Sequence, residues 1–208
     1  MTNVFVSGSI KIKKLDTKVI ERLKNIISSK LEVIIGDADG VDSSIQEFFK
    51  CNGLRSVVVY CSGDTPRNNL GNWVTKKISS NYKPGTRQYF TAKDKAMAAD
   101  CDYGFMIWDA SSTGTLSNVI ELVEKNKVGL VYVNKTKEFI KIKNIQDLET
   151  LINFMSVTSL KRADEKIGLF KKIESLKSIQ RDLFDEQPVE AIVLVKHPSL
   201  TKRSSELR

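Results

Sequence analysis

The 208-residue chain is poor in the side chains that build metal and disulfide sites. It holds one histidine, His197, and three cysteines, Cys51, Cys61 and Cys101, which lack the spacing of metal ligands. A zinc site and a disulfide-stapled secreted domain are therefore both disfavoured. We expect no bound metal and a reducing, cytoplasmic setting.

Long hydrophobic runs are also missing. No segment approaches the roughly 20 apolar residues that a membrane-spanning helix needs, so we expect no contact with a membrane. The N-terminus runs directly into a strand-like segment at Asn3 and lacks the pattern of a signal peptide. Hydrophobic residues at 41% and charged residues at 28% are typical of a globular protein that is large enough to bury a core.

Positive charge is in excess but is not concentrated in any one segment of the chain. The formal net charge is +8, and the lysines are spread along the whole chain. A diffuse positive field favours anionic ligands in general, nucleotides as well as nucleic acid. Aromatic residues make up only 8% of the chain and do not alternate with the basic residues, as a stacking platform for nucleic acid would require. We therefore rank nucleic acid below a small anionic partner.

Short apolar segments alternate with amphipathic ones along the first 156 residues. The apolar segments predict five strands, at residues 3–6, 31–35, 56–60, 103–108 and 128–133. Helical spacing predicts helices at residues 17–27, 41–51, 91–99, 116–123 and 146–154. This alternation predicts an α/β fold, a Rossmann-like parallel sheet of about five strands with flanking helices. Residues 61–87 fit no regular element.

The character of the chain changes after Ser156. Apolar residues recur at helical spacing from Leu160 to Leu183, and Pro188 ends that pattern. We expect residues 1–156 to form a nucleotide-binding domain, and residues 157–208 to form a helical extension with a strand-like segment at 189–195 and a flexible tail. The apolar stripe fits a helix packed on its own domain, and it also fits a dimerisation or partner-binding helix.

The stretch from Asp102 to Glu121 is the strongest candidate for a binding site. A buried strand ends at Asp109, and the hydroxyl-rich segment Ser111 to Thr115 leads into a helix. Ligands of open α/β sheets lie outside the carboxyl ends of the strands, and a helix N-terminus suits an anion. The same small residues also make a good helix cap, so a purely structural role stays open.

Two more turns follow predicted strands, at Ser7-Gly8-Ser9 and at Gly36-Asp37-Ala38-Asp39-Gly40. Turns that follow parallel strands meet at one edge of the sheet. Glycine allows close approach of the backbone to a ligand, and hydroxyl and N–H groups can hold phosphate. Neither turn is a Walker loop or a Gly-x-Gly-x-x-Gly fingerprint. Together, the three turns predict a nucleotide-like ligand, although capping and turn formation are alternatives for the aspartates.

These turns, with Ala98-Ala99-Asp100-Cys101-Asp102 and Ser112-Thr113-Gly114-Thr115, resemble the SLOG superfamily over roughly residues 1–135. That Rossmann-like group includes the lonely-guy phosphoribohydrolases, the DNA-processing protein A family and nucleotide-sensor domains of antiphage effectors. The resemblance implies that the turns hold the phosphate and ribose of a nucleotide-derived ligand. It also implies self-association, because such proteins are often dimers or larger.

One position departs from the enzymes of this group. The lonely-guy enzymes and the related deoxyribosyltransferases carry a catalytic glutamate where this chain has Asn118, and the paired glycines of the lonely-guy phosphate signature are absent. An amide can hydrogen-bond a ribose but cannot act as a carboxylate nucleophile. The departure favours binding over catalysis.

Other carboxylates lie near the same edge, among them Asp42, Asp94 and Asp109. If the protein is an enzyme, an N-glycoside hydrolase or transferase with Asp109 as its catalytic group fits best, because Asp109 ends the central strand. Arg67 and Arg87 could clamp phosphate.

Three functions follow from the sequence, in order of preference. They are binding of a nucleotide-derived ligand as a sensor or carrier, N-glycosidic chemistry, and nucleic-acid binding, and none of them needs a cofactor. The predicted ligand contacts are Ser7, Gly8, Ser9, Gly36, Asp37, Asp39, Gly40, Arg67, Arg87, Asp109, Ser112, Thr113, Gly114, Thr115 and Asn118.

Overall fold

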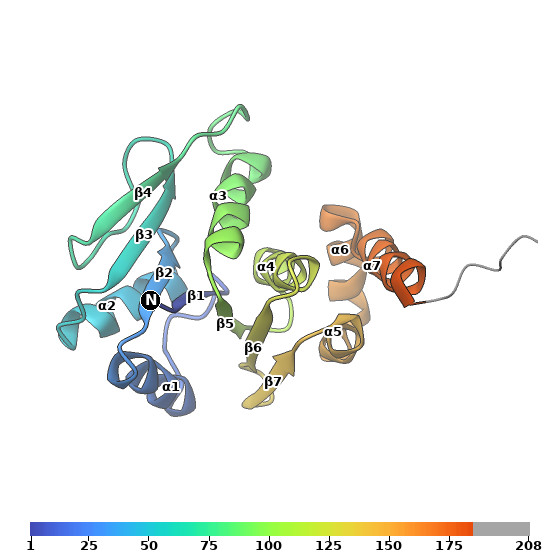
Figure 1. The fold of residues 1–208 in the computed structure, drawn as a ribbon, viewed down its shortest axis with the longest axis horizontal. Helices are drawn as coiled ribbons and strands as arrows, with labels where there is room; N and C mark the ends of the chain where they lie inside the picture. Colours follow the sequence, from blue (N-terminus) through green and yellow to red (C-terminus); the bar gives the residue numbers. More distant parts are fainter. Residues whose placement is uncertain (185–208) are drawn as a thin grey trace, which may run out of the picture.

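The computed structural model describes residues 1–184, with side chains as far as Ser178. The predicted segment at 189–195 and the tail lie outside the described residues. Seven strands form one sheet in this part of the chain (Figure 1). Their order across the sheet is β4 (Val74–Ile78), β3 (Val57–Ser62), β2 (Glu32–Gly36), β1 (Asn3–Gly8), β5 (Tyr103–Trp108), β6 (Val128–Val133) and β7 (Glu138–Ile142).

The five predicted strands are confirmed, and they form the centre of the sheet. All neighbouring pairs from β4 to β6 are parallel, and β7 is antiparallel to β6. The sequence did not predict β4 and β7, which lie at the two edges. Their sequences, Val-Thr-Lys-Lys-Ile and Glu-Phe-Ile-Lys-Ile, mix lysine with apolar residues because one side of each strand is exposed.

Helices cover both faces of the sheet. One face carries α1 (Thr17–Ser28) and α2 (Val41–Cys51), and the other carries α3 (Arg87–Asp100), α4 (Thr113–Glu124) and α5 (Ile145–Ile152) (Figure 1). Strand β1 contributes to both cores, since Val4 and Val6 pack on the first side and Phe5 on the second. Burial on both faces explains why the central strands are continuous apolar runs.

Side-chain caps set where several helices begin. Asp16 accepts a hydrogen bond from the N–H of Lys18 and starts α1, as its sequence predicts. Thr86 caps the N–H of Tyr89, so α3 begins at Arg87, four residues before the predicted start. Arg87 therefore belongs to the first turn of a helix rather than to a loop.

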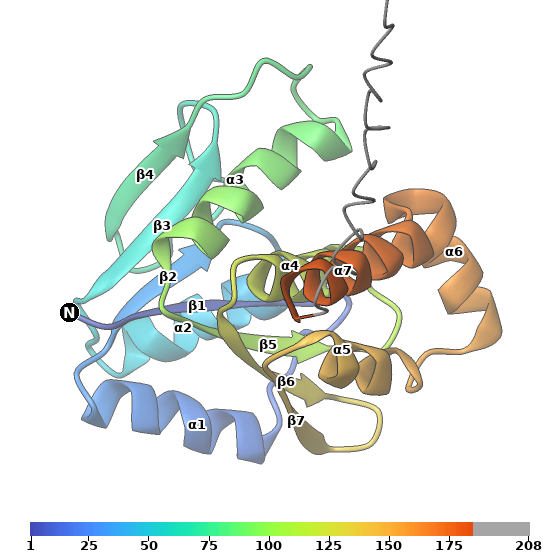
Figure 2. The ribbon, with the colours of Figure 1, turned by 45° about the vertical axis from the view of Figure 1, so that its right-hand side comes forward.

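The C-terminal stripe forms two helices instead of one, α6 (Val157–Ile167) and α7 (Leu169–Phe184). They meet at Gly168, whose φ of 61° lies in the left-handed region that ends helices. Figures 1 and 2 show both helices beside α4 and α5. Ala163, Leu169 and Ile173 are buried in the core that α4 and α5 share, so α6 and α7 pack on their own domain.

The order of the strands reverses once. The chain moves outward from β1 through β2 and β3 to β4, and α3 then returns it to the other side of β1, where β5 pairs. Such a switch point leaves a crevice at the carboxyl ends of the two strands. Among the helices of residues 1–184, none has the length and apolar character that crossing a membrane requires.

Candidate functional site

A cavity of about 290 Å³ lies at the switch point, outside the carboxyl end of β1. Its walls come from the end of β1, from the turn after β2, from α2, from the loop before β4 and from the first two turns of α3 and α4. The predicted contacts that line it are Ser7, Gly8, Arg67, Arg87, Ser112, Gly114, Thr115 and Asn118. The three turns that the sequence singled out are thus brought to one edge.

The other predicted contacts support the cavity from outside its lining. They are Ser9, Gly36, Asp37, Asp39, Gly40, Asp109 and Thr113. Ser9 is fully buried, and its Oγ accepts a hydrogen bond from the N–H of Asp109 at 3.1 Å and lies 3.3 Å from Thr115 Oγ1. This hydroxyl joins the turns after β1 and β5. Contact of either group with a ligand stays a prediction.

Asn118 is the most unusual polar residue of the cavity. Its side chain is 4% exposed, and its Nδ2 lies 3.4 Å from Ser7 Oγ, to which it donates. Its Oδ1 is buried and has no hydrogen-bond partner in the described residues. A buried acceptor without a partner costs free energy, and proteins rarely leave one. This carbonyl is therefore free to accept a hydrogen bond from a ligand.

Asp42 at the start of α2 also lines the cavity and is 3% exposed. Ser7 Oγ donates to its Oδ1 at 3.2 Å. Burial raises the pKa of Asp42 to about 7; nearby Asp94 adds to the rise, while Lys93 and the hydrogen bonds from Ser7 and Gly8 oppose it. Near neutral pH, this carboxyl group is present in both its neutral and its charged form.

Gly36, at the end of β2, makes room for this carboxyl group. A Cβ atom at this position would lie 2.6 Å from Asp42 Oδ2 and 3.0 Å from Lys93 Nζ. Contacts that short do not occur in folded proteins without displacement of a neighbour. Gly36 thus leaves the space in which the Asp42 and Lys93 side chains pack beside the cavity.

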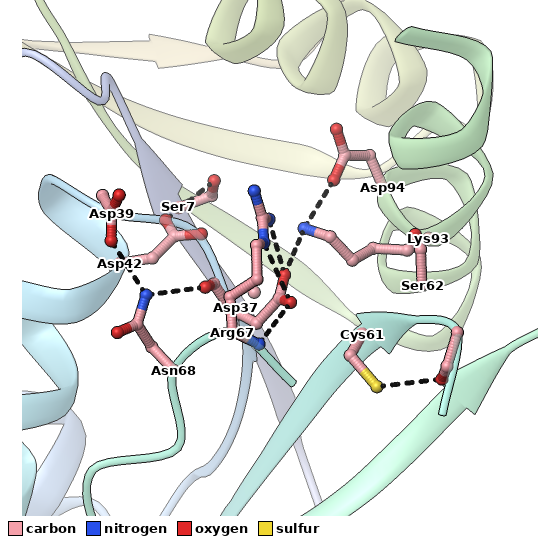
Figure 3. A network of polar contacts seen from close by, with 12 residues as sticks. Ser7, Asp37, Asp39, Asp42, Cys61, Ser62, Arg67, Asn68, Lys93 and Asp94 are labelled. Atoms are coloured by element: carbon pink, nitrogen blue, oxygen red, sulfur yellow. Dashed lines mark hydrogen bonds and ion pairs between the residues drawn. The ribbon is translucent and has the colours of Figure 1, made fainter. Parts of the chain in front are cut away.

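Asp37 holds a network of charges behind the cavity (Figure 3). Its carboxylate accepts two hydrogen bonds from the Arg67 guanidinium, at 2.7 and 3.1 Å, and one from the Arg67 N–H at 3.0 Å. Burial by itself would raise the pKa of Asp37, but Arg67 and Lys93 hold it below its usual value. The Arg67 guanidinium also lies over the ring of Phe90, 4.6 Å from its centre.

Lys93, on α3, is a buried cation that lines the cavity. Its Nζ lies 3.4 Å from Asp37 and 3.3 Å from Asp94 (Figure 3). Burial alone would lower the pKa of Lys93, but Asp94, Asp42 and Asp37 together hold it above its usual value. Lys93 was not among the residues predicted for the site, because a lysine beside an aspartate in a helix usually marks a solvated face.

Asp109 stabilises the turn that leads into α4. Its Oδ1 accepts from the N–H groups of Ser111 and Ser112 at 2.9 and 2.6 Å. Ser112 then caps the helix by accepting from the N–H of Thr115. Asp109 and Ser112 therefore do cap α4, as the structural alternative for this turn predicts. Capping does not pair every N–H group, because those of Thr113 and Gly114 in the first turn have no acceptor inside the helix.

Arg87 is the cation best placed to meet an anion at this helix end. Its guanidinium is exposed and donates to Thr113 Oγ1 at 3.1 Å. It forms no salt bridge with the described residues, whereas Arg67 and Lys93 both have carboxylate partners. Within residues 1–184, no group of histidine, cysteine and carboxylate side chains is arranged to hold a metal ion.

Comparisons with known proteins give a similarity to a solved structure but no family. Neither a scan against protein-family models nor a search of curated proteins found a match. Among solved structures, DNA processing protein A (DprA) from Streptococcus pneumoniae matches with a TM-score of 0.49 and 17% sequence identity. The match covers 73% of this chain and 56% of that one, so this chain spans little more than half the length of its neighbour.

Proposed function

We propose that the cavity at the switch point binds a nucleotide or a nucleotide-derived ligand, and that the protein acts as a sensor or carrier of that ligand. The observation that carries the proposal is the buried Oδ1 of Asn118, which has no hydrogen-bond partner among the residues that the structure describes. The cavity around this atom has two parts, one suited to hydroxyl groups and one suited to an anion.

The hydroxyl-binding part consists of Asn118, Ser7 and Asp42. A ribose hydroxyl can donate to Asn118 Oδ1 and can also interact with the Asp42 carboxyl group. The anion-binding part consists of Arg87 and the first turn of α4, whose free N–H groups and positive dipole end suit a phosphate. A sugar phosphate satisfies both parts at once, because its hydroxyl and phosphate groups are covalently linked.

Replacement of Asn118 by leucine tests the proposal. Leucine is similar in size, and the change removes both an acceptor that lacks a partner among the described residues and the hydrogen bond from Asn118 Nδ2 to Ser7 Oγ. These effects oppose each other, so we expect the free energy of unfolding to change by less than about 1.5 kcal/mol. Ligand affinity should fall by at least roughly tenfold, the effect of one lost hydrogen bond to a buried group. Calorimetric titration of both proteins with AMP, NAD, ADP-ribose and cyclic nucleotides measures the affinities, and urea unfolding measures the stabilities.

Trp73→Phe is the matched control. The Trp73 indole donates to the Leu54 carbonyl oxygen at 2.8 Å and does not line the cavity. This variant should lose some stability and keep its affinity for the ligand. Folded wild-type protein that binds none of the compounds would contradict the proposal, and so would unchanged affinity in Asn118→Leu.

N-glycoside hydrolysis or transfer is the second candidate, and Asp42 supports it. Asp42 is a buried carboxyl group in the cavity with a pKa of about 7, a value that suits a general acid at neutral pH. Asp109 fits that role less well because its Oδ1 already accepts two backbone N–H groups. Mass spectrometry after long incubation with the same compounds should then detect free base, which Asp42→Asn abolishes. Release that survives in that variant would exclude Asp42 from the reaction.

A further inference from the structure

A second cavity of about 380 Å³ adjoins the first, between α3, α4 and the joint of α6 and α7. It shares three lining residues with the first cavity, Arg87, Thr91 and Ser117. Four cations line it: Arg87, Lys95, Lys166 and Lys172. The nucleotide cavity thus continues into a basic one.

Most of this positive charge is not neutralised within the protein. Glu121 is the one acidic residue of the lining, and it lies 3.7 Å from Lys95. In the part of the chain whose side chains are described, Arg87, Lys166 and Lys172 form no salt bridge. Three cations without partners around one hollow attract an anion, because its charge offsets their mutual repulsion.

The joint of the C-terminal helices creates this arrangement. Gly168 in the left-handed conformation ends α6 just after Lys166, and α7 then places Lys172 on the same cavity. Leu169 and Ile173, which lie before and after Lys172 in α7, are buried in the core and hold α7 in place. The C-terminal helices therefore form one wall of a ligand-sized hollow.

We propose that the ligand spans both cavities. Its nucleotide part occupies the first, and the second phosphate of a pyrophosphate that passes Arg87 enters the basic one, together with the sugar or nucleoside that this phosphate carries. The inference rests on the proposed function and narrows its ligand class to pyrophosphate-bridged dinucleotides and nucleoside diphosphate sugars. Arg87 is the link because it lines both cavities and carries a guanidinium that suits phosphate oxygens.

The test compares AMP with ADP-ribose on the full chain. Calorimetry should show ADP-ribose binding at least roughly tenfold more tightly than AMP, because its second phosphate adds charge-assisted hydrogen bonds. In the double variant Lys166→Glu/Lys172→Glu, this gain should disappear while the affinity for AMP changes by less than about twofold. The matched control is Lys161→Glu/Lys171→Glu, which makes the same charge change on exposed positions of the same helices outside the cavity.

The outcomes separate this inference from the proposed function. Binding of AMP without a gain for ADP-ribose would overturn the spanning ligand and leave the nucleotide site standing. An equal loss of ADP-ribose affinity in the control variant would also overturn it, because a diffuse field would then explain the effect. Failure of the folded protein to bind either compound would contradict the nucleotide site itself, and the spanning ligand with it.

Discussion

At the residue scale, Asp42 couples the cavity to pH. The carboxyl group is buried and has a pKa of about 7 in the folded protein, against 3.8 for an unperturbed aspartate. Between these two values the folded state binds a proton that the unfolded state has released. Stability therefore falls as pH rises through this window, by up to about 1.4 kcal/mol per pH unit.

Asp42→Asn should remove this dependence. Asparagine can still accept from Ser7 but does not ionise, so the variant should gain stability relative to wild type as the pH rises from about 5 to about 8. Urea unfolding of both proteins at the two pH values measures the effect. Two proteins whose stabilities change in parallel with pH would show that Asp42 does not titrate in this range.

Asn118 shows at the same scale how a neutral side chain suits the charges of a buried site. A glutamate at this buried position would place a negative charge beside Ser7 and close to Asp42. The neutral amide avoids a pair of buried carboxylates, and one of its two polar atoms stays free for a ligand. At this position an amide therefore fits the surrounding charges better than a carboxylate would.

At the scale of secondary-structure elements, the Asp37 network joins three segments that are distant in sequence. Asp37 follows β2, Arg67 belongs to the loop before β4, and Lys93 lies in the middle of α3. The sequence placed Asp37 at the correct sheet edge. It could not reveal that two cations, about 30 and 56 residues later, converge on that carboxylate, because ion pairing across a fold leaves no periodic pattern.

Asp37→Asn should destabilise the protein by about 3 kcal/mol at neutral pH, since it leaves the buried Lys93 with only part of its compensating charge. Asp39→Asn is the control from the same turn. Asp39 is exposed and accepts one hydrogen bond from Asn68 at 3.0 Å, so its loss should cost less than about 1 kcal/mol. Urea unfolding measures both, and equal effects would show that the network does not stabilise the fold.

Elements with a local signal were predictable. The five central strands are apolar runs because they are buried on both faces, and α1 begins at the aspartate that caps it. Edge strands β4 and β7 lack such runs and were missed. The single predicted C-terminal helix became two because Gly168 adopts a conformation that the apolar spacing alone does not disclose.

At the scale of the whole molecule, the sequence predicted the edge of the sheet that holds the cavity, because parallel strands bring their carboxyl ends together. It did not predict the second cavity, whose wall depends on how α6 and α7 pack against α4. The dispersed lysines of the sequence also acquire a pattern in three dimensions, since Lys95, Lys166 and Lys172 meet around one hollow. Such convergence of distant residues becomes visible only in the folded chain.

The missing side chain at Gly36 has an evolutionary consequence. Because the space that a methyl group would fill there is taken by the side-chain ends of Asp42 and Lys93, alanine at position 36 requires these ends to shift and favours changes at positions 42 and 93. Descendants of this gene that acquire alanine at position 36 should carry shorter or uncharged residues at positions 42 and 93. Lineages that keep the buried carboxyl group and the buried amine should keep the glycine, whatever happens to the surface around them.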